Sequence, residues 1–267
     1  MRQADQASGM EQAVSEPARA TVTRVTALDL QSAARPVAAM ERFYPGAMDF
    51  GWHSHRRAQF LHCVQGFMTA RVPGTSFIIP SGHGLVIAPD LPHAVKAHGP
   101  VRMWSVYAEP EACGEPAWDG ARVVQASRLL CACLEALVKE PAEGGSERAD
   151  HLSALVLGEI AAAEPGRLAL PEPAERRIQS LCRELSAQPA TDLDIDAWAD
   201  RLGMSRRTLT RRFRTETGMS FVEWRRRLRV AHVMRLKAEG ERLEDIAERV
   251  GYRSVSALRA ALREALP

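Results

Sequence analysis

Two histidines one residue apart, His53 and His55, have the clearest chemical potential in the N-terminal half of the sequence. Residues i and i+2 of a β-strand point to the same face, so both imidazoles can enter one interior. Imidazole nitrogens bind transition metals and also exchange hydrogen bonds with organic ligands. The pair therefore indicates a binding site inside a β-structure.

The residues around this pair resemble the cupin motifs, His-x-His-x(3,4)-Glu-x(6)-Gly and Pro-x-x-x-His. The matching residues are His53-Ser54-His55, Gln59, Gly66 and Pro92-His93. By this resemblance, Gln59 stands in place of the usual glutamate and His93 comes from a facing strand. Three imidazoles and an oxygen ligand suit Zn, Ni, Fe or Cu, although a neutral amide weakens the binding of a hard divalent ion. The candidate metal ligands are therefore His53, His55, Gln59 and His93.

Three interpretations of this cluster are compatible with the sequence. The cluster can hold a divalent transition metal in a sensor pocket, or its histidines can hydrogen-bond a small-molecule effector without a metal. It can also be a structural cluster of satisfied histidines. Trp104 is expected to line the same effector pocket as the four candidate ligands. His62, His83 and His98 lack the spacing and are expected at the surface or in loops.

Short apolar stretches rich in β-favouring residues alternate with Gly and Pro between residues 34 and 109. This spacing is typical of an antiparallel sandwich or barrel. Together with the cupin resemblance, it predicts an effector-sensing antiparallel β-barrel of the jelly-roll kind. Residues 1–33 are rich in Ala, Ser, Gln and Glu without periodicity and are expected to be a disordered tail.

The segment 110–170 is predicted to be a helical linker. Residues 121–139 and 148–163 each carry a stripe of apolar residues at helical spacing. We expect these helices either to form a dimer or interdomain surface or to pack against the barrel within their own domain.

A repeated unit dominates the segment 171–267. The hexapeptide Trp198-Ala199-Asp200-Arg201-Leu202-Gly203 recurs 48 residues later as Ile246-Ala247-Glu248-Arg249-Val250-Gly251. Each copy ends in a Gly suited to a left-handed turn, and each is followed by a Ser that can cap the next helix, Ser205 or Ser254. This layout predicts two helix-turn-helix units, whose second helices enter the major groove of DNA.

A long helix is predicted between the two units, beginning at Ser220 and ending at Gly240. Its apolar face consists of Phe221, Trp224, Leu228, Ala231 and Met234. Its roughly 19 residues span just under 30 Å, which approaches the 34 Å separation of successive major grooves. One chain can therefore contact two grooves if the DNA bends somewhat.

The segment from about residue 174 to 266 resembles the double helix-turn-helix domain of the AraC/XylS type. The matching pieces are Leu202 to Leu209, Phe213, Glu216 to Ser220, Asp245 to Ala247 and Val250 to Ser254. The resemblance implies that Arg207, Thr210 and Arg211 contact bases and that Arg206 and Arg212 lie nearer phosphates. Arginine is chemically suited to guanine O6 and N7.

The second unit departs from the family pattern. Leu258 and Leu262 replace residues that are usually Phe, and Ala260 replaces a usual Arg. The candidate DNA contacts in this unit are therefore Ser256 and Arg259. We expect its contribution to DNA binding to be weaker and less selective than that of the first unit.

Charge is distributed unevenly although the formal net charge is only +2. Residues 171–267 contain 20 basic and 15 acidic side chains, whereas residues 1–170 contain 15 basic and 18 acidic ones. Between residues 201 and 237 there are twelve basic and two acidic side chains. Such an excess favours phosphate binding and makes affinity fall steeply with salt.

The termini and cysteines point to the cytoplasm. No apolar run is long enough for a membrane span, and no signal peptide is evident at the N-terminus. The five cysteines lack the spacing of a disulfide framework, so we expect reduced thiols.

An enzyme is the alternative function, because a cupin dioxygenase carries similar histidines around iron or copper. The sequence has no Gly-rich phosphate loop, nucleophile elbow or His-Glu-x-x-His. The DNA-binding module favours sensing over catalysis, so we expect no enzyme activity. Oxygen uptake by metal-loaded protein with phenols or diketones would contradict this expectation.

The sequence therefore predicts an α+β multidomain protein, with a cupin-like barrel, a helical linker and an all-α double helix-turn-helix domain. The expected function is transcription regulation through operator DNA, modulated by a small effector or a metal in the barrel. A homodimer is the expected assembly, with RNA polymerase as a further partner if the protein is an activator.

Overall fold

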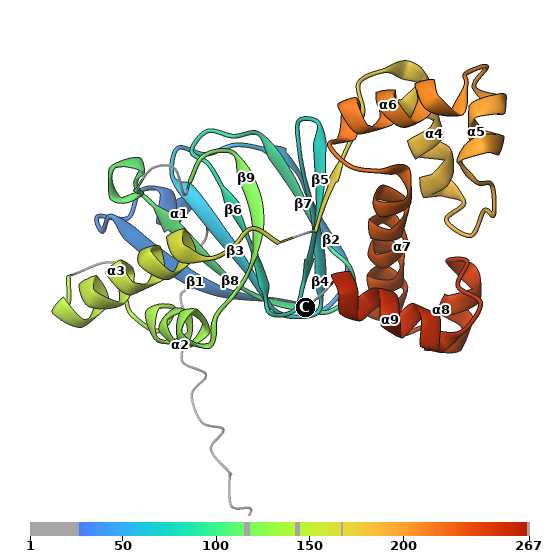
Figure 1. Cartoon of the computed structure of the whole chain (residues 1–267). Coiled ribbons are helices and arrows are strands. Elements are labelled where there is room, and N and C mark those ends of the chain that lie inside the picture. The colour runs from blue at the N-terminus through green and yellow to red at the C-terminus, as the bar shows by residue number, and fades with distance from the viewer. Residues whose placement is uncertain (1–26, 115–117, 142–144, 167, 266–267) are drawn as a thin grey trace, which may run out of the picture.

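The computed structural model describes residues 27–114, 118–141, 145–166 and 168–265. Two antiparallel five-stranded sheets form the N-terminal part, with the strand orders β1-β8-β3-β6-β9 and β10-β5-β4-β7-β2 (Figure 1). The strands are β1 (Val37–Tyr44), β2 (Met48–His53), β3 (Ala58–Gln65), β4 (Phe67–Val72), β5 (Thr75–Pro80), β6 (His83–Ile87), β7 (His93–Ala97), β8 (Val101–Ala108), β9 (Ala121–Gln125) and β10 (Ala169–Pro171). The predicted antiparallel β-domain is confirmed.

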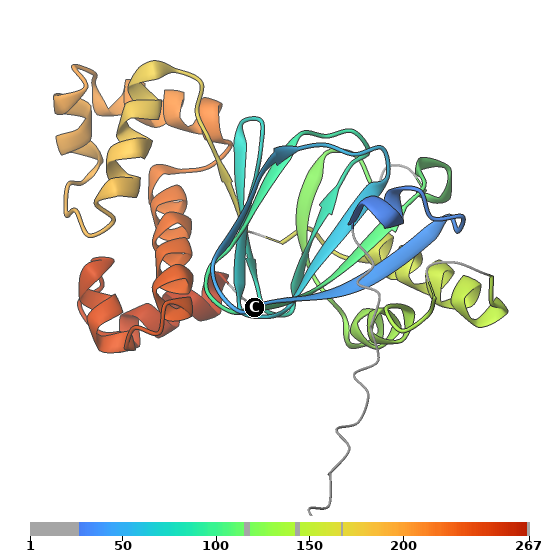
Figure 2. The same ribbon diagram turned by 180° about the vertical axis from the view of Figure 1, so that it is seen from behind.

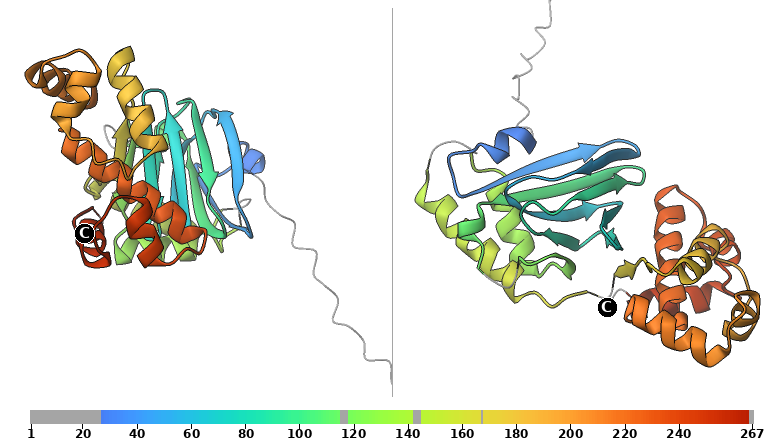
Figure 3. Two further views of the ribbon diagram at one scale, coloured as in Figure 1. Left: turned by 90° about the vertical axis from the view of Figure 1, so that its right-hand side faces the viewer. Right: turned by 90° about the horizontal axis from the view of Figure 1, so that it is seen from above.

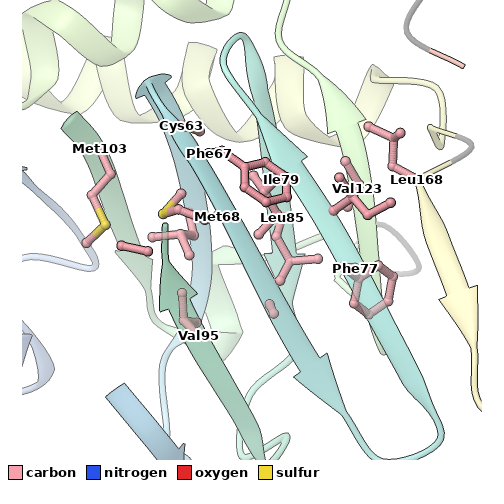
Figure 4. Close-up of a cluster of buried hydrophobic side chains, with 14 of the residues drawn as sticks. Cys63, Phe67, Met68, Phe77, Ile79, Leu85, Val95, Met103, Val123 and Leu168 are labelled. Atoms are coloured by element: carbon pink, nitrogen blue, oxygen red, sulfur yellow. The ribbon is translucent and has the colours of Figure 1, made fainter. Parts of the chain in front are cut away.

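The two sheets enclose a buried apolar cluster (Figure 4). Successive side chains of a strand point to opposite faces, and in β3, β6 and β8 alternate residues contribute to this interior. The cluster draws on both sheets, through residues such as Leu61, Ile79, Leu85 and Met103, and also includes Leu168 from the segment that leads to the C-terminal helices. This interior positions the side chains of the candidate pocket.

Two helices cover the outer face of the sheet that contains β8 (Figure 1). Helix α2 (Arg128–Leu137) and helix α3 (Glu147–Ala162) begin at the N-caps Ser127 and Ser146. Their apolar faces pack with Trp104 in a second buried cluster. The predicted helix over 148–163 is confirmed, and the face that it buries packs within its own domain.

The helix expected over 121–139 is wrong in its first part. Residues Ala121–Gln125 form strand β9, which pairs with β6 and completes one sheet. The adjacent β-branched residues Val123 and Val124 favour a strand because their χ1 rotamers are restricted in a helix. Both are buried, one on each face of the sheet.

The expectation of a disordered tail over 1–33 is also wrong in part. Residues Ala27–Gln31 form the short helix α1, and Leu30 is fully buried against Ala38, Met40 and Tyr107. The rest of the expected tail, residues 1–26, lies outside the described residues. A single-turn 3₁₀ helix, Pro110–Ala112, follows β8.

Six helices form the C-terminal part, and they gather on the side of the barrel opposite α2 and α3 (Figures 1 and 2). They are α4 (Arg176–Ala187), α5 (Ile195–Arg201), α6 (Arg206–Thr217), α7 (Phe221–Ala238), α8 (Leu243–Arg249) and α9 (Val255–Ala265). One apolar cluster joins α4, α5, α6 and the first half of α7. Another joins the second half of α7 to α8 and α9. Each helix-turn-helix unit therefore has its own small core at one end of α7.

The turn chemistry predicted from the sequence is present in both units. The hydroxyls of Ser205 and Ser254 accept hydrogen bonds from the amides of Thr208 and Ala257, 3.2 and 3.1 Å away. Gly203 and Gly251 have φ angles of +62° and +79°, as a left-handed turn requires. Ser220 caps α7 in the same way, through the amide of Glu223. The two predicted units and their spacer are thus confirmed.

The C-terminal helices are attached to the barrel at several points (Figure 3). Strand β10 pairs with β5, and the indole of Trp224 donates a hydrogen bond of 2.9 Å to the carbonyl of Pro171. Further along α7, Met234 and two alanines pack against the barrel cluster. The spacer helix therefore contacts the β-domain directly.

Candidate functional sites

The three candidate histidines converge where β2 ends and β7 begins. His53 ends β2, His93 begins β7, and the two residues are paired in the sheet register. One ligand nitrogen from each of His53, His55 and His93 lies within 4.8 Å of the others. His53 is exposed, His55 is half-buried and His93 is fully buried, so the site opens to solvent on one side.

Hydrogen bonds to the backbone select the same tautomer in all three rings. The Nδ1 atoms of His53, His55 and His93 lie 3.2, 2.7 and 2.8 Å from the carbonyls of Gly51, Arg57 and Leu91. Because a carbonyl can only accept, each Nδ1 carries a proton, which leaves Nε2 as the atom that can face a ligand. This is the arrangement in which backbone carbonyls orient histidine ligands toward a metal.

His93 presents an unused lone pair. Its Nε2 is buried and has no hydrogen-bond partner among the described residues. Burial lowers the pKa of His93 to about 4, and the adjacent imidazoles of His53 and His55 act in the same direction. The ring is therefore neutral at pH 7 and available to a ligand.

The amide of Gln59 faces the same site. Its nitrogen donates hydrogen bonds to Ser105 Oγ at 2.7 Å and to the hydroxyl of Tyr107 at 3.0 Å. These bonds turn the amide oxygen toward His55, whose Nε2 lies 3.2 Å away. Two lone-pair donors at this separation match neighbouring ligands of one ion, since Zn–N and Zn–O bonds are about 2.0–2.2 Å long.

A cavity of about 90 Å³ leads from the histidines into the barrel. Its lining is mainly apolar and aromatic, with four side chains that carry polar atoms and no Asp, Glu, Lys or Arg. The lining residues are Met40, Tyr44, Phe50, His53, Gln59, Leu61, Val95, Met103 and Tyr107. Its size and polarity suit a small, uncharged molecule.

The prediction that Trp104 lines this pocket is wrong. Trp104 points to the outer face of its sheet and packs with Leu130 and Leu134 of α2. Its neighbours along β8, Met103 and Tyr107, point inward instead. The error is one of strand parity, because a shift of one residue moves a side chain to the other face. Counting alternate positions along the strand from Met103 would have indicated Tyr107 as a residue that lines the pocket.

The DNA-binding candidates of the first unit lie on the exposed side of α6. Arg206, Arg207, Thr210, Arg211 and Arg212 are all exposed. Arg206 pairs with Asp196 at 2.9 Å and Arg212 with Glu175 at 2.5 Å. Within the described part of the chain, Arg207 and Arg211 have neither an ion pair nor a hydrogen bond. Their guanidinium groups are therefore free to contact bases or phosphates.

The second unit offers less positive charge. Ser256 and Arg259 are exposed on α9, as is Ala260, while Leu258 is buried in the unit's core. Leu258 therefore contributes to the packing of this core.

A basic hollow on α7 escaped the sequence analysis. It has a volume of about 300 Å³ and is lined by Phe221, Val222, Arg225, Arg226, Arg229 and Tyr252. Arg225 and Arg229 donate to carbonyls of the α4–α5 loop, and Arg226 pairs with Glu264 of α9. The hollow lies between the two units, and the helical spacing of its residues is the signal that could have indicated it.

Two family models match the chain. Residues 39–107 match the cupin domain, and residues 198–266 match the helix-turn-helix domain. The chain therefore joins a segment that is similar to cupin domains to one that is similar to helix-turn-helix domains. The matched ranges coincide with the barrel that holds the histidines and with the helices from α5 to α9.

Known proteins with similar sequences are named as regulators. The HTH-type transcriptional regulator NimR of Escherichia coli is 22% identical over 218 residues, which are 80% of this chain and 78% of NimR. The HTH-type transcriptional regulator RipA of Corynebacterium diphtheriae is 28% identical over 205 residues, or 76% of this chain and 56% of RipA. Among solved structures, ToxT of Vibrio cholerae is 10% identical, with a TM-score of 0.36 over 86% of this chain and 95% of ToxT.

The described helices have no candidate for a membrane span, since none combines the necessary length with the necessary apolar character.

Proposed function

We propose that this protein is a sequence-specific DNA-binding transcriptional regulator whose DNA affinity responds to a ligand in the barrel. Support for DNA binding comes from two capped helix-turn-helix units at opposite ends of one helix (Figure 1). The single observation that carries the proposal is the pair of unpartnered arginines, Arg207 and Arg211, on the exposed face of α6. The regulators named among similar proteins agree with it.

The test uses a duplex that the full-length chain selects from a random DNA library. Arg207→Ala and Arg211→Ala should each weaken binding to this duplex by about 1–3 kcal/mol, because each removes a bidentate base contact. Binding to random DNA should weaken much less. Fluorescence anisotropy at fixed salt measures both affinities.

Arg128→Ala is the matched control, since Arg128 is an exposed arginine on α2, on the opposite side of the barrel. It should leave both affinities unchanged. Equal losses on selected and random DNA would show that Arg207 and Arg211 hold only phosphate.

The proposed ligand site is the histidine triad together with Gln59. His53, His55 and His93 would hold a divalent transition ion, and the amide oxygen of Gln59 completes the donor set. When bound, an ion that accepts a fifth ligand beyond these four would supply a coordination position for a donor atom of a small effector. If Gln59 instead turns its amide nitrogen toward His55, the same pocket hydrogen-bonds a metal-free effector.

Calorimetric titration with Zn²⁺ separates these two forms of the proposal. The wild-type chain should bind one equivalent, and His93→Ala should lose binding because the buried, pre-oriented Nε2 is removed. His98→Ala is the control, since His98 lies outside the triad. Equal zinc binding by all three proteins would remove the metal from the proposal.

The proposal also includes a homodimer and, for an activator, contact with RNA polymerase. Leu129 and Leu155 are each about half exposed on α2 and α3, on the side of the barrel away from the C-terminal helices. Sedimentation velocity of the full chain measures the assembly.

A further inference from the structure

We infer that strand β7 transmits ligand binding at the histidine triad to the C-terminal end of α7, through a backbone contact between Gly99 and Ala238. This inference rests on the proposed ligand response and adds the route by which the barrel acts on the DNA-binding helices. The route has three parts. They are His93 in the ligand site, strand β7, which is paired on both sides, and the backbone contact between Gly99 and Ala238.

The first part is His93, which begins β7. Its ring centroid lies 4.2 Å from that of His53 and 5.0 Å from that of His55. An ion or molecule held among the Nε2 atoms must adjust these spacings. Because the ring is fully buried and tied to Leu91, the adjustment also displaces the backbone at the start of β7.

The second part is the strand itself. β7 pairs with β2 on one side and with β4 on the other, so its residues move together. The pairing continues past the strand end, because the amide of His98 donates to the carbonyl of Phe67 at 3.0 Å. The side chain of His98 is fixed as well, with Nε2 2.9 Å from the hydroxyl of Thr69. A displacement of the backbone at His93 therefore carries through to residue 98, because hydrogen bonds to the neighbouring strands hold the intervening backbone.

The third part is the contact of Gly99 with α7. Gly99 has a φ angle of +76°, and a Cβ atom built there would lie 2.8 Å from the carbonyl oxygen of Ala238. The two backbones therefore approach too closely for a Cβ atom to fit without a shift. With no side chain between them, a displacement of Gly99 displaces the end of the helix.

The end of α7 carries the second helix-turn-helix unit. Val233 and Leu236 of α7 belong to the buried core shared with α8 and α9, whereas Trp224 and Leu228 belong to the core of the first unit. A shift of Ala238 thus changes the position of one unit relative to the other. Two units that enter successive major grooves are sensitive to this change, since the groove separation is fixed at about 34 Å.

Gly99→Ala tests the contact, and Gly74→Ala is its matched control. Both glycines have φ = +76°, so alanine meets the same unfavourable φ at each position. An added Cβ at Gly74 meets nothing within 4 Å, whereas at Gly99 it meets the Ala238 carbonyl. A loss of response in Gly99→Ala that is absent in Gly74→Ala therefore reports the crowding of the Ala238 carbonyl.

The measurement is the affinity for the selected duplex with and without Zn²⁺. In the wild type and in Gly74→Ala, zinc should change the affinity by about fivefold or more, which is the lower range of allosteric coupling. In Gly99→Ala the change should fall below about twofold at unaltered zinc affinity. A full zinc response in Gly99→Ala would overturn the inference and leave the proposed function standing.

Hydrogen–deuterium exchange of the wild type gives a second readout that needs neither DNA nor a variant. Zinc should alter exchange at β7 and at residues 234–240, and it should leave residues 221–226 unaltered. Altered exchange at β7 with none at 234–240 would contradict the inference. If zinc binds and DNA affinity does not change in any protein, the proposed ligand response itself fails.

Discussion

His62 is buried at the junction of the barrel and α2. Its ring stacks between Phe60 and Trp104, with centroid distances of 6.2 and 5.6 Å, and its Nε2 lies 3.9 Å from the sulfur of Cys131. The expectation of a surface or loop position was wrong for His62 and also for His83, which begins the buried strand β6. Both lie in strands whose two faces are covered, and such strands show no hydrophobic alternation.

The stability of the protein should fall as the pH is lowered from about 6.5 to about 4. Burial lowers the pKa of His62 to about 4, and nearby His83 acts in the same direction. The unfolded chain, with a histidine pKa near 6.5, therefore binds more protons in this interval. By linkage, His62 should contribute a loss of at most about 3 kcal/mol. Urea denaturation at pH 7 and pH 4.5 measures it.

His62→Phe removes the titrating group and should reduce this pH dependence. His151→Gln replaces an exposed histidine of α3 and serves as the control, with the wild-type dependence retained. If His62→Phe keeps the full pH dependence, the loss of stability originates in other groups.

Residue types and spacing indicated the histidine triad, whereas its supporting residues could not be inferred. The spacing of His53 and His55 in a strand is local information, and the motif supplied His93. Ser105 and Tyr107, which orient Gln59, lie more than 40 residues away and reach it only through the pairing of β3 with β8. Such partners depend on strand register, which the sequence pattern does not specify.

The second helices of the two units, α6 and α9, differ in charge. α6 presents five arginines, whereas Ala260 occupies an exposed position of α9 where the family pattern has arginine. Each phosphate contact releases a counterion and contributes to the salt dependence of DNA affinity. The first unit should therefore provide most of this dependence.

Ala260→Arg should strengthen DNA binding and steepen its salt dependence. One added phosphate contact changes the slope of log K against log salt by about −0.9. Ala154→Arg adds the same charge on the exposed face of α3 and is the control. Affinity measured at several salt concentrations gives both slopes, and equal slopes for the two variants would show that α9 does not reach the backbone.

Helix α7 has two apolar faces rather than the single one expected. Trp224 and Leu228 pack into the first unit, whereas Ala231 and Met234 contact the barrel. Helical spacing placed all four in one stripe, because spacing groups residues without identifying their partners. The helix itself was predictable from its caps, and its contact with another domain was not.

At the scale of the whole molecule, the nearly neutral net charge combines two dissimilar parts. Residues 1–170 carry three more acidic than basic side chains, and residues 171–267 carry five more basic ones. The acidic excess lies in residues 110–170, with ten acidic and five basic side chains, and this segment repels DNA while the C-terminal helices attract it. The molecule therefore favours orientations in which the C-terminal helices meet the duplex first.

The order of the domains was predictable, and the way they are joined was not. Strands and helices follow from local composition, so the sequence separates a β-domain from an all-α domain. The three residues of β10 are too few for a strand signal, and two of them are Leu170 and Pro171 in a proline-rich connector. Their extended conformation comes from pairing with β5, a tertiary interaction.

Strand β10 also determines where this chain can be divided. It shields the edge of β5, while its carbonyls at Ala169 and Pro171 accept hydrogen bonds from Arg227 and Trp224 of α7. A barrel fragment ending before Ala169 would expose an unpaired strand edge, which is a template for aggregation. A helical fragment beginning after Pro171 would leave the Trp224 indole without its acceptor. Chimeras that exchange sensors between such regulators should therefore keep residues 169–171 with both halves, by joining homologous chains within the connector instead of deleting it.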